Sequence, residues 1–149
     1  MTAYLITTLS IAIGLLVLFL ILKTVMKAVG DSMGSMIAVE FPEGEVLMQE
    51  PKSTFMGQKS KELAQASEDG GLVLTRDGLH FVPSSSGMSL TIPVDRILNL
   101  STPRRFLGKS KTFELLQVDF KSEDGVDDSA AFTVSNPKSW LQAIQSVMG

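Results

Sequence analysis

The chain has 149 residues, a net charge of −3 and no cysteine. Without cysteine, disulfide frameworks, thiol nucleophiles and thiolate metal sites are excluded. The chain after residue 27 holds 11 of the 13 Lys and Arg and all 16 Asp and Glu, a net charge of −5. Binding to duplex nucleic acid requires clustered positive charge to neutralise phosphates, so we predict no nucleic-acid partner.

An uncharged apolar segment covers residues 3–22, and the first charged side chain is Lys23. Twenty helical residues rising about 1.5 Å each cross the hydrocarbon core of a bilayer, which is roughly 30 Å thick. A cleaved signal begins with positive charge and has a shorter apolar stretch. We therefore predict a transmembrane anchor helix with its basic flank over residues 1–27. Cleavage remains an alternative because small residues follow at Ala28, Gly30, Ser32 and Ser35.

Two lysines, Lys23 and Lys27, flank the C-terminal end of this segment, and no side-chain charge precedes it. The positive-inside rule then predicts a single-pass protein of the plasma (inner) membrane, with its N-terminus outside and its C-terminal domain cytoplasmic. Within the segment, Ser10 and Gly14 form a small-xxx-small pair, which would let another helix pack closely.

Residues 28–40 are rich in Gly and Ser without a sustained period, which predicts a juxtamembrane linker before a domain over residues 41–149. The domain contains short apolar and β-prone stretches separated by turn residues. They cover 45–50, 53–56, 71–75, 78–82, 89–93, 96–101, 112–121 and 129–135. Seven or eight strands at this spacing favour a sandwich or barrel.

Two of these stretches carry more detailed predictions. Asp77-Gly78 between LVLT and LHFV predicts a tight hairpin with a positive φ. In the stretch 112–121, Leu116, Val118 and Phe120 share the face that we expect to be the core.

The chain closes on a segment with helix signals. Asn136 and Pro137 suit the N-cap and first position of a helix. An apolar stripe then predicts an amphipathic helix of about three turns, which would cover an open end of the β structure; it consists of Trp140, Leu141, Ile144, Val147 and Met148. The polar residues 57–70 are expected to form a short helix over SKELAQAS or a loop.

The strings GGLVLTRDGLHFVP, SLTIPVDRILNL and SNPKSWLQAIQSVMG together resemble a pleckstrin-homology-like (PH-like) or GRAM domain. The resemblance covers roughly residues 41–149. It implies a bent, seven-stranded antiparallel barrel capped by the C-terminal α-helix, and a non-catalytic module that binds lipids or proteins. Members that bind phosphoinositides carry several basic residues between their first two strands. Here GEVLMQEPKSTF offers only Lys52, which argues against recognition of a specific headgroup.

The most concentrated positive charge lies in PRRFLGKSK, a predicted loop between two strands. Its site residues are Arg104, Arg105, Phe106, Leu107, Lys109 and Lys111. In one interpretation all six protrude, and the loop binds an anionic lipid surface or a protein partner. In the other, Phe106 and Leu107 fold back into the core and leave a solvated hairpin.

Other motifs are weaker. Gly30-Asp31-Ser32-Met33-Gly34 matches the G-x-S-x-G pattern of hydrolases, but that motif needs a preceding strand and a general base, and His80 is the chain's one histidine. We expect His80 on a strand surface, opposite to Leu79 and Phe81. The acidic SEDGVDDS lacks the spacing of a calcium loop and predicts a charged hairpin turn. Asn99-Leu100-Ser101 fits a glycosylation sequon by chance. No catalytic residue, cofactor or metal site is predicted.

Together these features predict a membrane-anchored, non-catalytic interaction module. A PH/GRAM-like domain would bind a protein partner or an anionic lipid surface at the cytoplasmic face. The alternative is a small accessory subunit of a larger membrane complex, packed through Ser10 and Gly14.

Overall fold

The computed structural model describes residues 1–42, 44–61, 67–85, 87 and 89–149. The chain divides into two compact units, residues 1–32 and 33–149. Most of the predicted short helix over SKELAQAS lies outside the described residues; of that segment, only the 3-10 turn η1 (Lys59–Lys61) and Ser67 are described.

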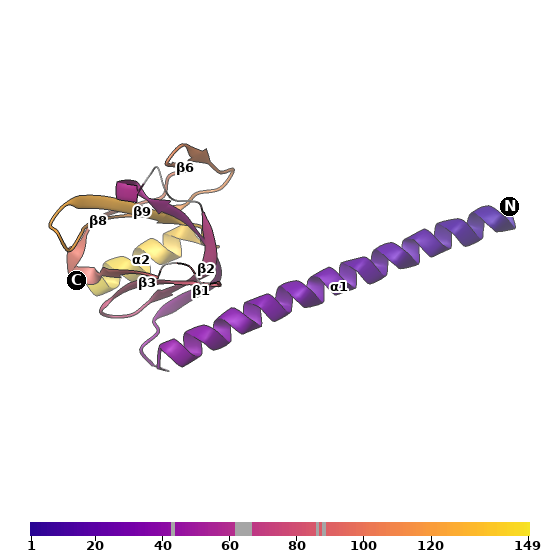
Figure 1. Ribbon diagram of the computed structural model, residues 1–149, viewed down its shortest axis with the longest axis horizontal. Coiled ribbons are helices and arrows are strands. Elements are labelled where there is room, and N and C mark those ends of the chain that lie inside the picture. The colour runs from indigo at the N-terminus through magenta and orange to yellow at the C-terminus, as the bar shows by residue number, and fades with distance from the viewer. Residues whose placement is uncertain (43, 62–66, 86, 88) are drawn as a thin grey trace. The chain divides into compact units, whose positions relative to one another are not determined.

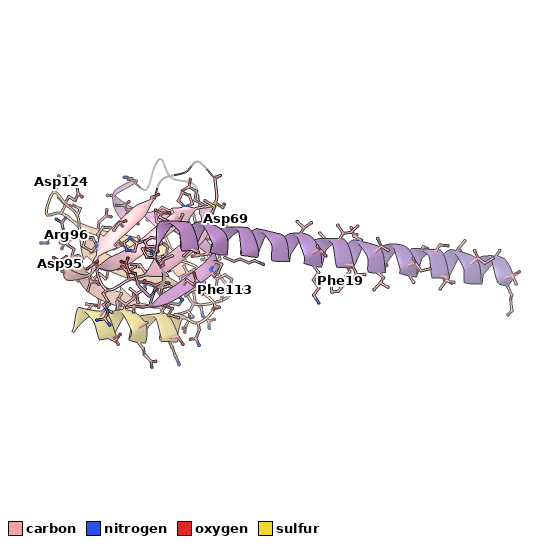
Figure 2. All side chains as sticks on the ribbon, turned by 90° about the horizontal axis from the view of Figure 1, so that it is seen from below. Phe19, Asp69, Asp95, Arg96, Phe113 and Asp124 are labelled. Atoms are coloured by element: carbon pink, nitrogen blue, oxygen red, sulfur yellow. The ribbon has the colours of Figure 1, made fainter. Side chains whose placement is uncertain are left out.

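Helix α1 (Thr2–Glu40) contains the apolar segment. Its stretch Ile6–Val25 is long and apolar enough to cross a membrane, with its side chains, Phe19 among them, exposed along the helix (Figure 2). Ser10 Oγ donates a hydrogen bond to the Ile6 carbonyl and Thr24 Oγ1 to that of Leu20, so these hydroxyls are satisfied within the helix. A membrane-spanning helix shares these properties with an N-terminal signal sequence.

Residues 28–40, predicted as a juxtamembrane linker from their lack of a sustained period, are helical, because α1 continues to Glu40. The last turns of α1 carry an apolar stripe that the glycines and serines of this segment conceal in the sequence. Met33 and Ile37, one turn apart, are 4% and 1% exposed and pack with Val73, and Phe41 and Val46 extend this cluster. Burial of these side chains outweighs the low helix propensity of Gly30 and Gly34.

Seven strands form one antiparallel sheet in the order β4-β3-β2-β1-β9-β8-β5. They are β1 (Met48–Gln58), β2 (Glu68–Leu74), β3 (Gly78–Pro83), β4 (Leu90–Pro93), β5 (Ile97–Ser101), β8 (Leu116–Lys121) and β9 (Asp127–Phe132). The 3-10 turn η2 (Val94–Arg96) joins β4 to β5. A separate ribbon consists of β6 (Arg105–Phe106) and β7 (Lys109–Ser110).

The first two predicted strands, 45–50 and 53–56, are in fact one strand, β1. Its pairing with β2 shifts register between Glu50 and Ser53. Pro51 has no N–H to donate, and a bulge accommodates such a residue without ending the strand. The predicted strand 112–121 is shorter than expected and begins at Leu116 as β8.

The hairpin predicted around Asp77-Gly78 joins β2 to β3, but Gly78 does not have a positive φ. Thr75 N–H donates to the Gly78 carbonyl and closes the turn. A Cβ atom on Gly78 would lie 2.8 Å from the Ile92 carbonyl oxygen. Glycine is therefore required by the close approach of β3 to β4, and not by the turn.

The main core lies inside the folded sheet. Leu116, Val118 and Phe120 of β8 are buried in it, as the alternation predicted, and Ile92 of the distant edge strand β4 joins the same cluster. The rings of Phe55, Phe81 and Phe132 meet there with centroids 5.4–6.0 Å apart. Because both ends of the strand order share one core, the sheet curves over itself.

Helix α2 (Pro137–Met148) covers one end of this folded sheet (Figure 1). The predicted cap is confirmed: Asn136 Oδ1 accepts a hydrogen bond from Ser139 N–H at 3.2 Å. Trp140 and Ile144 are fully buried, and Leu141 and Val147 pack against the core. The chain thus has a mainly-β antiparallel domain, an N-terminal apolar helix and a C-terminal helix.

Candidate interaction surface

The predicted basic loop folds into the ribbon β6–β7, which pairs as a separate two-stranded sheet (Figure 1). Arg105 pairs with Ser110 and Phe106 with Lys109, and Lys111 N–H donates to the Arg104 carbonyl at 2.7 Å. Leu107 and Gly108 form the turn with φ values of 49° and 76°. Two successive positive φ values are typical of the tight turns that match the twist of a hairpin.

Cross-strand partners of an antiparallel pair share a face. Phe106 and Lys109 therefore lie on one face of the ribbon, and Arg105 lies on the other. Phe106 is 6% exposed and packs with Met56, Leu115 and Ala131. On the same face, Lys109 Nζ donates to the Met56 carbonyl and to Ser67 Oγ, each at 3.1 Å. The interpretation in which all six residues protrude is therefore wrong, because Phe106 and Lys109 hold the ribbon on β1. Leu107 is partly buried beside them.

Arg104, Arg105 and Lys111 remain exposed. Within the described parts of the chain, one ion pair forms, between Lys121 and Asp127 at 3.5 Å. None of these three cations therefore has an anionic partner there. The ribbon thus presents three cations, without the apolar tip that insertion into a bilayer would use.

A shallow groove of about 680 Å³ lies next to the ribbon. We call it the ribbon groove. Its walls come from the β1 bulge, the segment before β8 and the junction of β9 with α2; they are lined by Glu50, Lys52, Arg104, Thr112, Phe113, Glu114, Thr133, Val134, Ser135 and Pro137.

Sequence reasoning missed Phe113 as a site residue. Phe113 is 47% exposed and lines the ribbon groove, whereas Leu115, two residues later, is fully buried. A strand over the whole predicted stretch 112–121 would put Phe113 and Leu115 on one face, but the strand begins only at Leu116, so the alternation does not apply to Phe113. The available signal was its setting among the polar residues Thr112 and Glu114, directly after the basic loop.

One wall of the groove is held in place by Glu50. This carboxylate accepts hydrogen bonds from Ser135 N–H at 3.0 Å, from Ser135 Oγ at 3.1 Å and from Trp140 Nε1 at 3.3 Å. These bonds join β1 to the start of α2. Glu50 is therefore part of the scaffold, and Glu114 is the other carboxylate that lines the groove.

A second hollow, of about 390 Å³, lies near the β8–β9 turn, and we call it the end pocket. Figure 2 labels two of its residues, Arg96 and Asp124, at the same end of the domain. Three cations line it, Lys61, Arg96 and Lys121, together with the anions Glu123 and Asp124. Charge of both signs makes the end pocket a poorer site for a multiply charged anion than three cations alone would be.

The loop between the first two strands differs from the one assumed from the sequence. Lys52 lies inside β1, and the connection from β1 to β2 runs over residues 59–67. This connection contributes Lys59 and Lys61, both exposed. The argument that only Lys52 is available there is wrong, because the bulge in β1 was mistaken for a turn.

The remaining positions considered in the sequence are His80, the G-x-S-x-G residues and possible metal ligands. His80 is half-buried: its ring nitrogens lie 3.0 Å from Thr75 Oγ1 and 3.2 Å from Thr91 Oγ1, and its ring centroid lies 4.9 Å from that of Phe41. The G-x-S-x-G residues lie in α1, which lacks the strand and sharp turn of a nucleophile elbow. Among the described residues, no cluster of three His, Asp or Glu side chains could hold a metal ion.

Two further predictions concern α1 and the acidic turn. A Cβ atom on Gly14 would meet nothing within 4 Å, so the Ser10–Gly14 face is open. The SEDGVDDS segment forms the β8–β9 hairpin turn, with Gly125 at φ 77°. Asp128 of this segment is only 5% exposed and is bonded to β1 and η1, so it belongs to the scaffold.

No protein-family model and no curated protein matches this sequence. Forty chains of solved structures match its fold. One belongs to "The 8S snRNP Assembly Intermediate": it is 8% identical with a TM-score of 0.56, over 72% of this chain and 84% of that one. Another is the C-terminal domain of an unknown protein from Leishmania infantum, 18% identical with a TM-score of 0.54, over 78% and 97%. At these identities the likeness concerns the fold alone.

Proposed function

We propose that this chain is a non-catalytic, membrane-anchored interaction module, whose PH/GRAM-like domain binds a protein partner at the cytoplasmic face of the plasma membrane. The observation that carries the proposal is the unpaired set Arg104, Arg105 and Lys111 beside the exposed Phe113, on a hydrogen-bonded β scaffold. Exposed aromatic rings with nearby arginines are typical of protein-binding surfaces.

The PH-like part of the proposal rests on topology. The first four strands form the meander β4-β3-β2-β1, and β9-β8-β5 continue the sheet from β1. A helix with a central, buried Trp140 follows the last strand. Seven antiparallel strands around one core, closed by a C-terminal helix, agree with the bent barrel that the sequence resemblance implies.

A membrane tether would make a modest affinity of the domain for its protein partner sufficient. Met33, the first buried residue of the domain, follows the apolar stretch that ends at Val25 by eight residues. Eight residues reach at most about 28 Å even when fully extended. If α1 is an anchor, the domain is confined to a thin layer at the membrane, and a partner in that layer is met at high effective concentration.

A protein partner is favoured over a lipid surface by the burial of Phe106 and by the engagement of Lys109. A leaflet-binding tip needs protruding apolar side chains together with cations. The ribbon groove is concave, a shape that fits a protruding protein segment better than a flat leaflet.

The test is photo-crosslinking of the full chain in native membranes. A photoreactive amino acid replaces Arg105 in one variant and Asp95, an exposed residue of η2, in the control. We expect a discrete protein adduct from position 105 and none from position 95. Lipid adducts alone, or the same adducts from both positions, would contradict a protein-binding ribbon.

The alternative, an accessory subunit of a larger complex, is favoured by the open Ser10–Gly14 face. Native electrophoresis after mild detergent extraction would then show the chain in a stable complex. Replacement of Gly14 by Leu would release it, while the crosslink from position 105 would be absent.

A further inference from the structure

The ribbon groove has the dimensions of a binding site for a short peptide segment. Its volume of about 680 Å³ is within the range of natural ligand sites, roughly 300–1,000 Å³. It is bounded by three separate parts of the chain, at Lys52, at Phe113 and at Pro137. A segment lying in it would contact all three at once.

The charges of the groove select the kind of segment. Lys52 and Arg104 line it, and Arg105 and Lys111 lie on the adjoining ribbon. Of its two carboxylates, Glu50 is occupied by three hydrogen bonds from the scaffold. Lys52 and Arg104 therefore face a ligand, with Glu114 as the opposing charge, and Arg105 and Lys111 add positive charge nearby. Charge complementarity then favours an acidic ligand.

Phe113 adds an apolar requirement. Its half-exposed ring lies in the same groove as Val134 and Pro137, which provide an apolar wall. An apolar side chain of the ligand would cover this ring and remove it from water. Burial of an aromatic ring at the centre of an interface is a common source of binding energy.

The groove is also preformed. Ser53 Oγ donates to the Thr133 carbonyl, and Thr54 N–H to Thr133 Oγ1, each at 2.8 Å. Together with the Glu50 bonds, they join β1, β9 and α2 behind the groove. A rigid site loses little conformational entropy when a ligand binds.

We infer that the ribbon groove binds a short acidic peptide segment of the partner protein, with one apolar side chain of that segment packed on Phe113. This inference rests on the proposed function and names its partner chemistry. Lys52 and Arg104 would bind the acidic side chains of the segment, and Phe113 would hold its apolar one.

The test uses the full chain in nanodiscs of phosphatidylcholine and a display library of short peptides. Each peptide has fixed acidic flanks around a randomised centre; a matched library has basic flanks. We expect enrichment of acidic peptides with a Leu, Phe or Trp at the centre. Their affinity, measured by fluorescence anisotropy, should fall at least about tenfold in Phe113→Ser and in Arg104→Glu, and it should decrease with salt.

Two variants serve as controls because they change an exposed apolar side chain and an exposed arginine elsewhere. Leu98, 52% exposed on β5, and Arg76, in the β2–β3 turn, lie outside the groove. Leu98→Ser and Arg76→Glu should change the affinity less than about twofold. Circular dichroism of all four variants shows whether each one folds.

The inference is overturned by failure to enrich acidic peptides, or by equal losses in groove and control variants. It is also overturned if phosphatidylserine nanodiscs, rather than peptides, protect the ribbon from hydrogen exchange. If the crosslink from position 105 persists in native membranes but is unaffected by Phe113→Ser and Arg104→Glu, the interaction module stands and this inference alone fails. Absence of any protein crosslink instead removes the proposed function.

Discussion

Asp128 is a buried carboxylate in a segment whose sequence suggests only a solvated turn. Its oxygens accept hydrogen bonds from Gln58 Nε2 and Ser60 Oγ, both at 2.6 Å, from Ser60 N–H at 2.9 Å and from Ser129 N–H at 2.8 Å. A buried charge of this kind is tolerated because donors surround it. It connects β9 to the end of β1.

We expect Asp128→Ala to lower the free energy of unfolding by about 2–4 kcal/mol, because several donors lose their acceptor inside the protein. Urea unfolding followed by fluorescence of Trp140, the single and fully buried tryptophan, measures it. The matched control is Asp127→Ala. Asp127 is exposed and pairs only with exposed Lys121, so its loss should cost less than about 0.5 kcal/mol. Equal effects of the two changes would refute the role of Asp128.

Among the described residues, three side chains have shifted pKa values that make stability depend on pH. Burial lowers the pKa of His80 below its usual 6.5, and the charges of Glu40 and Asp77 oppose this only in part. Burial raises the pKa of Asp119 and Asp128, but hydrogen bonds from Gln117, Ser129 and Asn99 to Asp119, and from Ser60, Gln58 and Ser129 to Asp128, outweigh it. The pKa of each therefore lies below the usual 3.8. In all three cases the unfolded chain binds protons more readily than the folded one.

Acidification should therefore destabilise the domain in two steps. The first lies below the usual His80 pKa of 6.5 and should be absent in His80→Gln. The second lies below the usual Asp pKa of 3.8 and should be smaller in Asp128→Asn. Urea midpoints measured from neutral to acidic pH test this. A midpoint that rises on acidification would contradict the assignments.

At the scale of elements, the last turns of α1 belong to the domain. Ile37 is 1% exposed and packs with Met33 and Val73, whereas its neighbour Met36 is 45% exposed. A Cβ atom on Gly71 would lie 2.9 Å from Ile37 Cδ1, so β2 uses glycine where the helix approaches it. The two turns thus form a small second core on the outer face of the sheet.

We expect Ile37→Ala to weaken this docking by about 2–4 kcal/mol, since it leaves a cavity in a packed cluster. Faster hydrogen exchange at the amides of residues 33–41 and 71–73 would report it. Met36→Ala, on the same helix turn, should have almost no effect. If both substitutions leave exchange unchanged, these turns of α1 do not stabilise the domain.

At the scale of the whole molecule, the proposed function requires an uncleaved anchor and a cytoplasmic domain. The chain has no cysteine, so a single introduced thiol is a clean probe. In sealed right-side-out membrane vesicles, a membrane-impermeant maleimide should label Thr2→Cys but not the exposed position Ser85→Cys. Detergent should make both reactive. The reverse pattern would invert the topology, and loss of the Thr2→Cys label from the mature chain would reveal a cleaved signal.

The features that local sequence determined are those encoded within one element. The apolar stretch Ile6–Val25, the Asn136 cap with the Trp140 stripe, and the alternation of Leu116, Val118 and Phe120 were all predictable. Each follows from helical or strand periodicity over neighbouring residues. The mainly-β character followed from turn signals in the same way, but these signals gave eight segments, and the bulge that merges the first two into β1 leaves seven main strands.

Only the tertiary structure decided those features in which a residue contacts partners far away in the sequence. Whether Phe106 is buried depends on Met56, some fifty residues earlier, and Glu50 finds its donors at Ser135 and Trp140. The helical end of α1 is stabilised by Val73 and not by its own composition. Local patterns specify which residues prefer burial or exposure, but the folded sheet decides which face each one meets, because its bulges and turns change the register.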